Sequence, residues 1–284
     1  MLGISAKLPL RTSHALGSFL GKSLMRGNAT EKRTAQTNIA LCFPELSTQQ
    51  RQTLLEQALI ETGKTIAESG IVWLSAQKRF FSLIKEVHGE EHLRAGLKKG
   101  KGVILAIPHL GNWEAIGIYC SSRYPMTSLY RPPRVSGMDD TIRKARQRFG
   151  AKLVPTNARG VKALYQALGH NELVAILPDQ DPRESGGQFS PFFGHQANTM
   201  TLLSRLAQKT AATVLCAYAE RLPDSQGFTI HFRPTSSEIL NKEMSTSLAA
   251  LNQSVEAAVR CIPTQYQWSY KRFRTRPDGE AKIY

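Results

Sequence analysis

The chain has 284 residues, with 37 Lys and Arg against 22 Asp and Glu, so its formal net charge is +15. A chain of this length can bury roughly 75% of its unfolded surface, which allows one sizeable core. The sequence has no internal repeat, low-complexity tract or long linker, and no stretch approaches the length of apolar sequence that a membrane-spanning helix needs. These features favour one domain with an N-terminal extension.

The positive charge fits a polyanionic partner, and nucleic acid, an anionic membrane and an acidic protein all qualify. The four cysteines are scattered and lack the paired spacing of a zinc site. We interpret them as buried free thiols in a reducing compartment, and we expect no metal site. They are Cys42, Cys120, Cys216 and Cys261.

The N-terminal segment, residues 1–30, predicts a short amphipathic helix. Its apolar residues fall at helical spacing, with Lys22 and Arg26 beside them. Such a helix either packs on the domain's own core or lies in a membrane interface. The apolar positions are Leu16, Phe19, Leu20 and Leu24.

The remainder of the chain, residues 31–284, is predicted to form a single domain. Helices are expected at 31–42 and at 48–78, with Ser47 as the N-cap of the second. Strands are then expected at 103–107, 126–130, 152–155, 173–177, 213–219 and 228–232. Helices are expected between and after them, at 113–122, 138–149, 159–168, 198–209 and 245–260. This alternation predicts an α/β fold with a mostly parallel central sheet flanked by helices.

The segment 103–114 is the strongest candidate for chemistry. A dense apolar run ends in proline, His109 follows at once, and a Gly-Asn turn opens a helix that carries Glu114. His109 is therefore placed at the carboxyl end of a strand, where open α/β sheets hold their sites. Glu114 is expected to reach back to the imidazole, fix its tautomer and leave one nitrogen free to take a proton. A structural histidine is the alternative, and Asn112 is a candidate for substrate binding.

Two basic segments follow the next predicted strand. Arg131 comes directly after strand 126–130, and helix 138–149 carries Arg146 and Arg148. Arg146 flanks the apolar face of that helix, whereas Lys144 points away from it. An arginine held against the domain favours a functional role. The alternative is that its long side chain only packs along the edge of the core with its charged end in solvent.

Strand 173–177 repeats the pattern of an apolar run, a proline and polar groups. Asp179 follows the proline and is expected to orient an arginine or a substrate hydroxyl, unless it is a solvated loop acid. Gln180 and Asp181 are candidates for substrate binding. Phe192 and Phe193 either line an apolar substrate channel or pack in the core. The segment 265–277 interleaves aromatic and basic residues, as nucleic-acid and lipid surfaces do.

His109-x4-Glu114 resembles the H-x4-D/E motif of membrane-associated acyltransferases of the lysophospholipid acyltransferase superfamily. The glutamate variant is similar to the lipid A late acyltransferases, the lauroyl and myristoyl transferases of Gram-negative bacteria. The resemblance extends over nearly the whole chain. It includes 38–44, Tyr130-Arg131-Pro132, Arg146 with Arg148, 178–181, 191–194 and the end of the chain at 265–277.

The resemblance implies a glycerolphosphate-acyltransferase-like fold and transfer of a lauroyl or myristoyl chain from acyl carrier protein to a hydroxyl of a lipid A precursor. By position, His109 and Glu114 match the family's catalytic pair, and Arg146 and Asp179 match its further functional residues. His109 is the implied general base, and the acyl thioester is a substrate, so no cofactor is expected.

The resemblance also implies an enzyme at the cytoplasmic face of the inner membrane. Many members begin with a membrane-spanning helix, whereas this chain has only the amphipathic segment, so we expect peripheral or monotopic attachment to the anionic surface. Two other functions stay open. One is an acyltransferase with a lysophospholipid or another glycolipid as acceptor. The other is a basic nucleic-acid-binding protein, which the His-Glu pattern disfavours.

Overall fold

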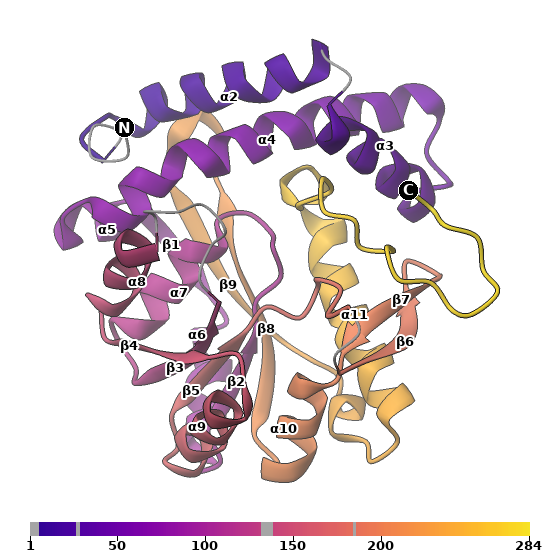
Figure 1. Ribbon diagram of the computed structural model, residues 1–284. Coiled ribbons are helices and arrows are strands. Elements are labelled where there is room, and N and C mark those ends of the chain that lie inside the picture. Colours follow the sequence, from indigo (N-terminus) through magenta and orange to yellow (C-terminus); the bar gives the residue numbers. More distant parts are fainter. Residues whose placement is uncertain (1–5, 27–28, 132–138, 184–185) are drawn as a thin grey trace.

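A seven-stranded sheet runs through the middle of the protein, with helices on both of its faces (Figure 1). The structure is a computed structural model and describes residues 6–26, 29–131, 139–183 and 186–284. The strands are β1 (Ile84–His88), β2 (Val103–Ala106), β3 (Met126–Tyr130), β4 (Ala151–Pro155), β5 (Leu173–Ile176), β6 (Gly187–Phe192), β7 (His195–Met200), β8 (Thr213–Arg221) and β9 (Phe228–Pro234). The α-helices are α2 (Leu10–Arg26), α3 (Thr30–Cys42), α4 (Thr48–Leu74), α5 (Gln77–Ser82), α6 (Glu90–Lys98), α7 (Trp113–Ser121), α8 (Asp139–Gln147), α9 (Ala158–Gly169), α10 (Leu202–Thr210) and α11 (Met244–Cys261).

The central sheet is mostly parallel, as the sequence predicted. Its strand order is β1-β9-β8-β2-β5-β3-β4, and β8 and β9 form an antiparallel pair at one side. The middle strands β2 and β5 are parallel and fully buried, which is why their sequences are almost continuously apolar. The predicted α/β class is confirmed.

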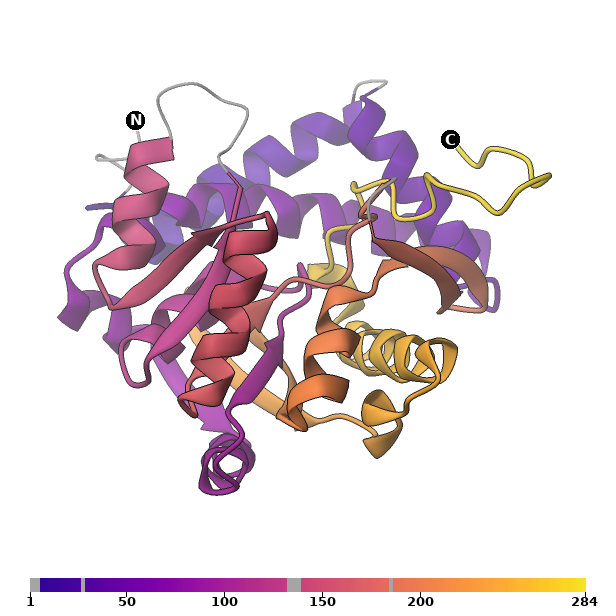
Figure 2. The same ribbon diagram turned by 60° about the horizontal axis from the view of Figure 1, so that its bottom comes forward.

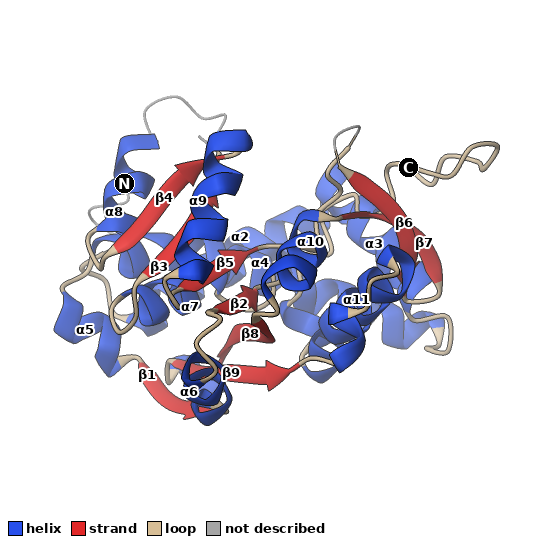
Figure 3. Ribbon diagram, turned by 90° about the horizontal axis from the view of Figure 1, so that it is seen from below, coloured by secondary structure: helices blue, strands red, loops and turns tan. Residues whose placement is uncertain are grey.

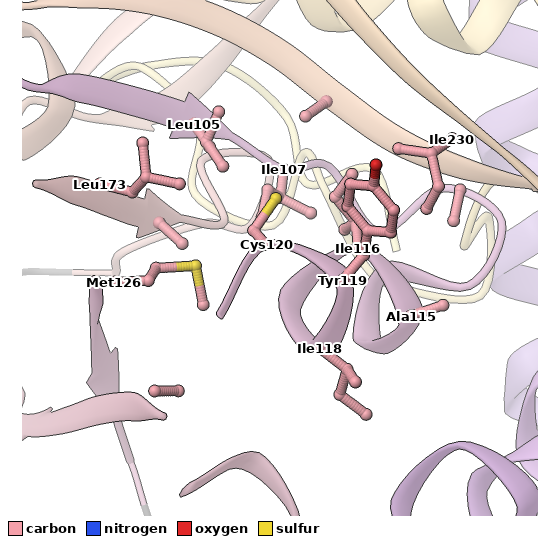
Figure 4. Close-up of a cluster of buried hydrophobic side chains, with 14 of the residues drawn as sticks. Leu105, Ile107, Ala115, Ile116, Ile118, Tyr119, Cys120, Met126, Leu173 and Ile230 are labelled. Carbon is pink, nitrogen blue, oxygen red and sulfur yellow. The ribbon is translucent and has the colours of Figure 1, made fainter. Parts of the chain in front are cut away.

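Helices cover the two faces of this sheet. In Figure 2 the strands β3 and β4 run between α8 on one side and α9 on the other. The core on the α7 and α8 side includes Leu105, Ile116 and Met126, part of which Figure 4 shows. A second core fills the α9 and α10 side, and a third lies under α3, α4 and α11. Figure 3 shows the same arrangement from below.

Several predicted boundaries differ from the structure. The helix expected at 198–209 begins at Leu202, because residues 195–200 pair with β6 as the second strand of a hairpin. The helix expected at 48–78 ends at Leu74, and α5 follows as a separate helix. Strand β1 was not predicted. It lies at the sheet edge, is nowhere fully buried, and so lacks a clear apolar pattern.

Local signals at the helix ends were more reliable. Ser47 caps α4 in a capping box with Gln50, as expected from its position. The apolar face of α8 packs on the core through Ile142 and Ala145, and Lys144 is exposed. Three of the four cysteines are buried, but Cys261 is exposed, contrary to the prediction, because it ends α11 on the outer side of that helix.

The N-terminal helix α2 lies along α4 and contacts it through small residues. A Cβ atom at Gly17 would come within 2.5 Å of the Lys64 Cα, so the two backbones are in close contact there. Three residues of the predicted apolar stripe face away from the protein, since Leu16, Phe19 and Leu20 are exposed by 48%, 66% and 41%. The fourth, Leu24, is partly buried and packs against the core cluster under α3, α4 and α11. The helix therefore packs on the domain and also presents apolar side chains to its surroundings. No described helix is both long enough and apolar enough to cross a bilayer.

Candidate active site

Two buried parallel strands bring the main candidate residues together. Ala106 of β2 and Ile176 of β5 are partners in register. His109 and Asp179 each follow three residues beyond these partners, so both side chains lie at the same carboxyl edge of the sheet. This convergence depends on the two strands being neighbours in the sheet.

The loop after β2 is held in place by backbone contacts. Gly111 has a φ of +60°, and a Cβ atom there would come within 2.0 Å of the Ala219 carbonyl oxygen, so only glycine fits. The Gly111 N–H donates to the Gln265 carbonyl at 3.0 Å, and the Asn112 N–H donates to the Ala219 carbonyl at 2.9 Å. These bonds set the position of His109 relative to α7.

Asp179 binds His109 through both of its carboxylate oxygens. Oδ1 lies 2.8 Å from Nδ1 of the imidazole, and Oδ2 accepts the His109 backbone N–H at 2.9 Å. Because a carboxylate only accepts, Nδ1 carries a proton and Nε2 has a free lone pair. The Gln180 amide nitrogen lies 3.1 Å from Nε2. This arrangement leaves Nε2 as a proton acceptor.

Glu114 does not play the part that the sequence predicted for it. Both imidazole nitrogens have partners other than Glu114, whose carboxylate instead binds the guanidinium of Arg146. Nε of Arg146 lies 2.9 Å from Oε2, and Nη2 binds Oε1. Asp179 therefore orients the histidine, and Glu114 orients the arginine. The reason is that Glu114 lies on the side of α7 that faces α8.

The two carboxyl groups are ionised in this environment. Burial by itself would raise the pKa of Glu114, but the charge and hydrogen bonds of Arg146 outweigh it, so the pKa lies below its usual value. Burial likewise opposes ionisation of Asp179, but its electrostatic attraction to His109 and the hydrogen bonds that His109 donates lower its pKa below the usual value. Each carboxylate is thus matched to one cationic or proton-donating partner.

The side chain of Asn112 is hydrogen-bonded within the protein at both of its polar atoms. Its side chain caps α7 by accepting the Ala115 N–H at 3.0 Å, and it donates to the buried Glu68 at 2.7 Å. Glu68 also pairs with Arg221 of β8 and lies 2.6 Å from Nε2 of His14. The sequence did not predict this cluster, which joins α2, α4 and β8 beneath the start of α7.

A cavity of about 1080 Å³ opens at the carboxyl edge of the sheet. Its lining includes six of the predicted residues, among them both ion-pair partners, Glu114 and Arg146. Asp179 lies buried behind the imidazole instead. The predicted residues in the lining are His109, Glu114, Arg131, Arg146, Gln180 and Asp181.

Three predicted residues lie elsewhere. Arg148 donates to the Val72 carbonyl at 3.3 Å and is outside the cavity lining. Phe192 and Phe193 are buried in the core beside Phe43 and Trp268 and also do not line the cavity. Core packing, the alternative left open for these two rings, is what the structure shows.

Asp181 lines the cavity but is engaged by the protein itself. Its carboxylate accepts from the side chain of Asn198 at 2.9 Å and from the backbone N–H groups of Arg183 and Thr275. These contacts tie the loop after β5 to the end of the chain. Pro132, which belongs to the Tyr130-Arg131-Pro132 motif, lies outside the described residues.

The structure adds arginines that the sequence did not single out. Arg183, Arg205 and Arg274 line the same cavity as Arg131, and all four are exposed. Arg205 lies in α10, inside the predicted helix 198–209, and no motif marked it. Arg274 lies in the aromatic and basic segment 265–277, which the sequence did mark as a whole. Within the described part of the chain, no group of three or more His, Cys, Asp or Glu side chains is arranged to hold a metal ion.

Comparison with known proteins identifies similar sequences of nearly full length. The lipid A biosynthesis lauroyltransferase of Escherichia coli K12 is 28% identical over 100% of this chain and 92% of its own length. The palmitoleoyltransferase of the same organism is 26% identical with the same coverage, and its myristoyltransferase is 25% identical over 93% of this chain and 82% of its own. The sequence profile of the bacterial lipid A biosynthesis acyltransferases matches residues 1–275. The chain therefore belongs to the bacterial lipid A biosynthesis acyltransferase family.

Proposed function

We propose that this chain transfers a fatty acyl group from the thioester of acyl carrier protein to a hydroxyl of a lipid A precursor. The observation that carries this proposal is the His109–Asp179 pair, which leaves an accepting lone pair on Nε2, beside the Glu114–Arg146 pair. His109, Glu114 and Arg146 line the same cavity. The names of the relatives support the class of acceptor and the acyl chemistry. The acyl thioester and the acceptor are the only reactants that the reaction requires.

His109 is the general base in this proposal. The acceptor hydroxyl takes the place of the Gln180 amide at Nε2, and its proton moves to Nε2 as its oxygen attacks the thioester carbonyl carbon. The C–S bond then breaks, and the imidazolium returns the proton to the departing thiolate. Asp179 holds the imidazole and stabilises its charged form. A positioned base of this kind contributes about 10²–10⁴-fold to the rate.

Arg146 is the group that we assign to the developing oxyanion. Backbone N–H groups at the start of a helix can also bind an oxyanion. Here the N–H groups of Gly111 and Asn112 already donate to the carbonyl groups of Gln265 and Ala219. The guanidinium of Arg146 lines the cavity, and Glu114 holds it by two hydrogen bonds. Such fixed donors act on charge that develops in the transition state.

The exposed arginines explain the partners that we propose. Arg131, Arg183, Arg205 and Arg274 surround the cavity, where they can attract the phosphates of a lipid A precursor or the acidic surface of acyl carrier protein. In this interpretation the positive charge of the chain serves anionic lipid and protein partners, and nucleic acid is not among them.

We place the enzyme at the cytoplasmic face of the inner membrane, attached peripherally or monotopically through α2. The support is the exposed apolar stripe of α2, beside which Arg11, Lys22 and Arg26 are also exposed. Each basic residue near an anionic surface contributes about 1 kcal/mol to attachment.

One experiment tests the reaction and its acceptor together. The purified protein is given labelled acyl carrier protein thioester with a lipid A precursor, a lysophospholipid or another glycolipid, and products are identified by mass spectrometry. We expect transfer to the lipid A precursor, and no transfer by a folded His109→Ala variant. Transfer only to another acceptor would contradict the proposed substrate, and near-normal turnover by His109→Ala would contradict the proposed base.

A further inference from the structure

The cavity extends along the face of the sheet that carries α7 and α8. We call this part the apolar lobe. Its walls are apolar or small, and Glu114 and Arg146 line the same cavity. The residues of the apolar lobe are Gly117, Ile118, Met126, Ala151, Leu153 and Ala175.

The strand register shows how deep the apolar lobe reaches. Ser128 of β3, which also lines the cavity, is in register with Leu153 and Ala175. Met126 is in register with Ala151, two residues farther from the carboxyl edge, which corresponds to about 6.6 Å of strand. Both residues are buried, and Ile118 of α7 joins them. These three residues line the cavity and also belong to the core cluster in which Figure 4 labels Met126 and Ile118, so they mark the deep end of the lobe.

Gly117 forms part of the helical wall of the lobe. Together with Trp113 and Glu114 it lies on the side of α7 that lines the cavity. A Cβ atom added at Gly117 meets nothing within 4 Å, whereas one at Gly160 of α9 would come within 1.7 Å of a carbonyl oxygen. Packing therefore does not require glycine at 117. Glycine also has a low helix propensity, so its presence at 117 and the unfilled space beside it need another explanation.

We infer that Gly117 and Met126 determine the length of the acyl chain that this enzyme transfers. Gly117 leaves the lobe wide enough for a chain to pass, and Met126 limits how far the chain extends. This inference rests on the proposed acyl transfer. Membership of the family does not decide chain length, because the relatives are named for lauroyl, palmitoleoyl and myristoyl transfer.

Two variants with opposite effects test the inference. The full-length protein is assayed with saturated acyl carrier protein thioesters of increasing length, and kcat/KM is measured for each. Gly117→Leu fills the lobe and is expected to shift the preference to shorter chains, by about tenfold or more between neighbouring lengths. Met126→Ala deepens the lobe and is expected to shift the preference to longer chains. Gly117→Ala serves as a milder change if the leucine variant does not fold.

Gly169→Leu is the matched control. This helical glycine at the end of α9 also has open space around its Cβ position, but it is exposed and outside the cavity lining. Its chain-length profile should equal that of the wild type. Folding of every variant is checked by circular dichroism and thermal unfolding.

The outcomes separate this inference from the proposed function. If Gly117→Leu and Met126→Ala scale all chain lengths by one factor, the assignment of the lobe is wrong although acyl transfer stands. If the wild type transfers no chain from any donor, the proposed function fails. Displacement of a fluorescent fatty acid by free fatty acids of increasing length then decides whether the same two variants alter the lobe.

Discussion

Replacing Asp179 by asparagine should remove the base from the active site while leaving its shape almost unchanged. Oδ1 of Asp179 accepts the proton of Nδ1 at 2.8 Å, and Oδ2 accepts the backbone N–H of the same histidine at 2.9 Å. Asparagine has one acceptor oxygen and one donor NH₂ group in those places, so it cannot accept from both.

Either orientation of the new amide has a cost. If its oxygen accepts the backbone N–H, its NH₂ group faces Nδ1, and the imidazole proton moves to Nε2. If its oxygen accepts from Nδ1, the NH₂ group faces the backbone N–H, and two donors oppose each other at a buried position. The first orientation sets the Nε2 proton against the part-buried Gln180 amide, which costs less than two opposed donors at a buried position, so we expect it to dominate.

The expected loss follows from that change of tautomer. An imidazole protonated on Nε2 cannot take the proton of a hydroxyl, and a comparable change in a catalytic triad reduces kcat by about 10⁴-fold. We therefore expect Asp179→Asn to lose about 10³–10⁴-fold in turnover, which corresponds to about 4–5.5 kcal/mol of barrier. Acyl transfer from labelled acyl carrier protein measures the rate, and urea unfolding reports whether the fold is retained.

The control is Asp140→Asn, which changes an exposed carboxylate of α8 and should leave turnover unchanged. A folded Asp179→Asn protein that keeps more than about a tenth of wild-type turnover would show that His109 does not act as an oriented base.

Three further predictions concern stability and membrane attachment. Arg221→Met leaves the buried Glu68 without its main partner and should lower the free energy of unfolding by about 3–5 kcal/mol. The control Arg260→Met removes an exposed ion pair and should cost less than about 1 kcal/mol. Equal losses of the two variants in urea unfolding would refute this prediction. Burial opposes ionisation of Glu68, yet Arg221 and His14 lower its pKa from 4.5 to about 2. The ionised Glu68 therefore adds about 3 kcal/mol to the free energy of unfolding above pH 4.5, and this contribution is lost as the pH falls toward 2. Unfolding free energies measured across this range should show that slope for the wild type and not for Glu68→Gln. Serine substitutions across the exposed stripe of α2 should abolish sedimentation with anionic liposomes at unchanged stability, because full burial of each such side chain in the membrane contributes about 1.5–3 kcal/mol. Serine at the exposed Leu240 is the control. Unchanged sedimentation of the stripe variant would contradict attachment through α2. The stripe substitutions are Leu16→Ser, Phe19→Ser and Leu20→Ser.

The sequence predicted those parts of the fold that depend on local patterns. Central strands such as β2 and β5 are recognisable because burial on both faces makes them continuously apolar. The cap at Ser47 is recognisable because its hydrogen bonds join residues only three positions apart. The end of β7, residues 198–200, was assigned to a helix because its polar sequence becomes a strand only by pairing with β6. The division of the chain at residue 30 stays a prediction.

For the amphipathic helix α2, the periodic pattern of the sequence does not suffice to predict how the helix is oriented on the protein. The spacing of Leu16, Phe19 and Leu20 shows that one side of α2 is apolar. It does not show which side packs on the protein. The close contact of Gly17 and Gly21 with α4 decides that, and it turns the apolar stripe outward.

In the active site, too, the sequence determined some features and the tertiary structure determined others. The sequence by itself determined that His109 stands at the carboxyl end of a buried strand, since a local run of residues specifies that position. It also indicated Glu114, Arg146 and Asp179, but it paired the histidine with the wrong carboxylate. Only the tertiary structure decided the pairs, because the register of β2 against β5 brings Asp179 to the imidazole from 70 residues away, and the packing of α8 on β4 and α4 places Arg146 beside Glu114.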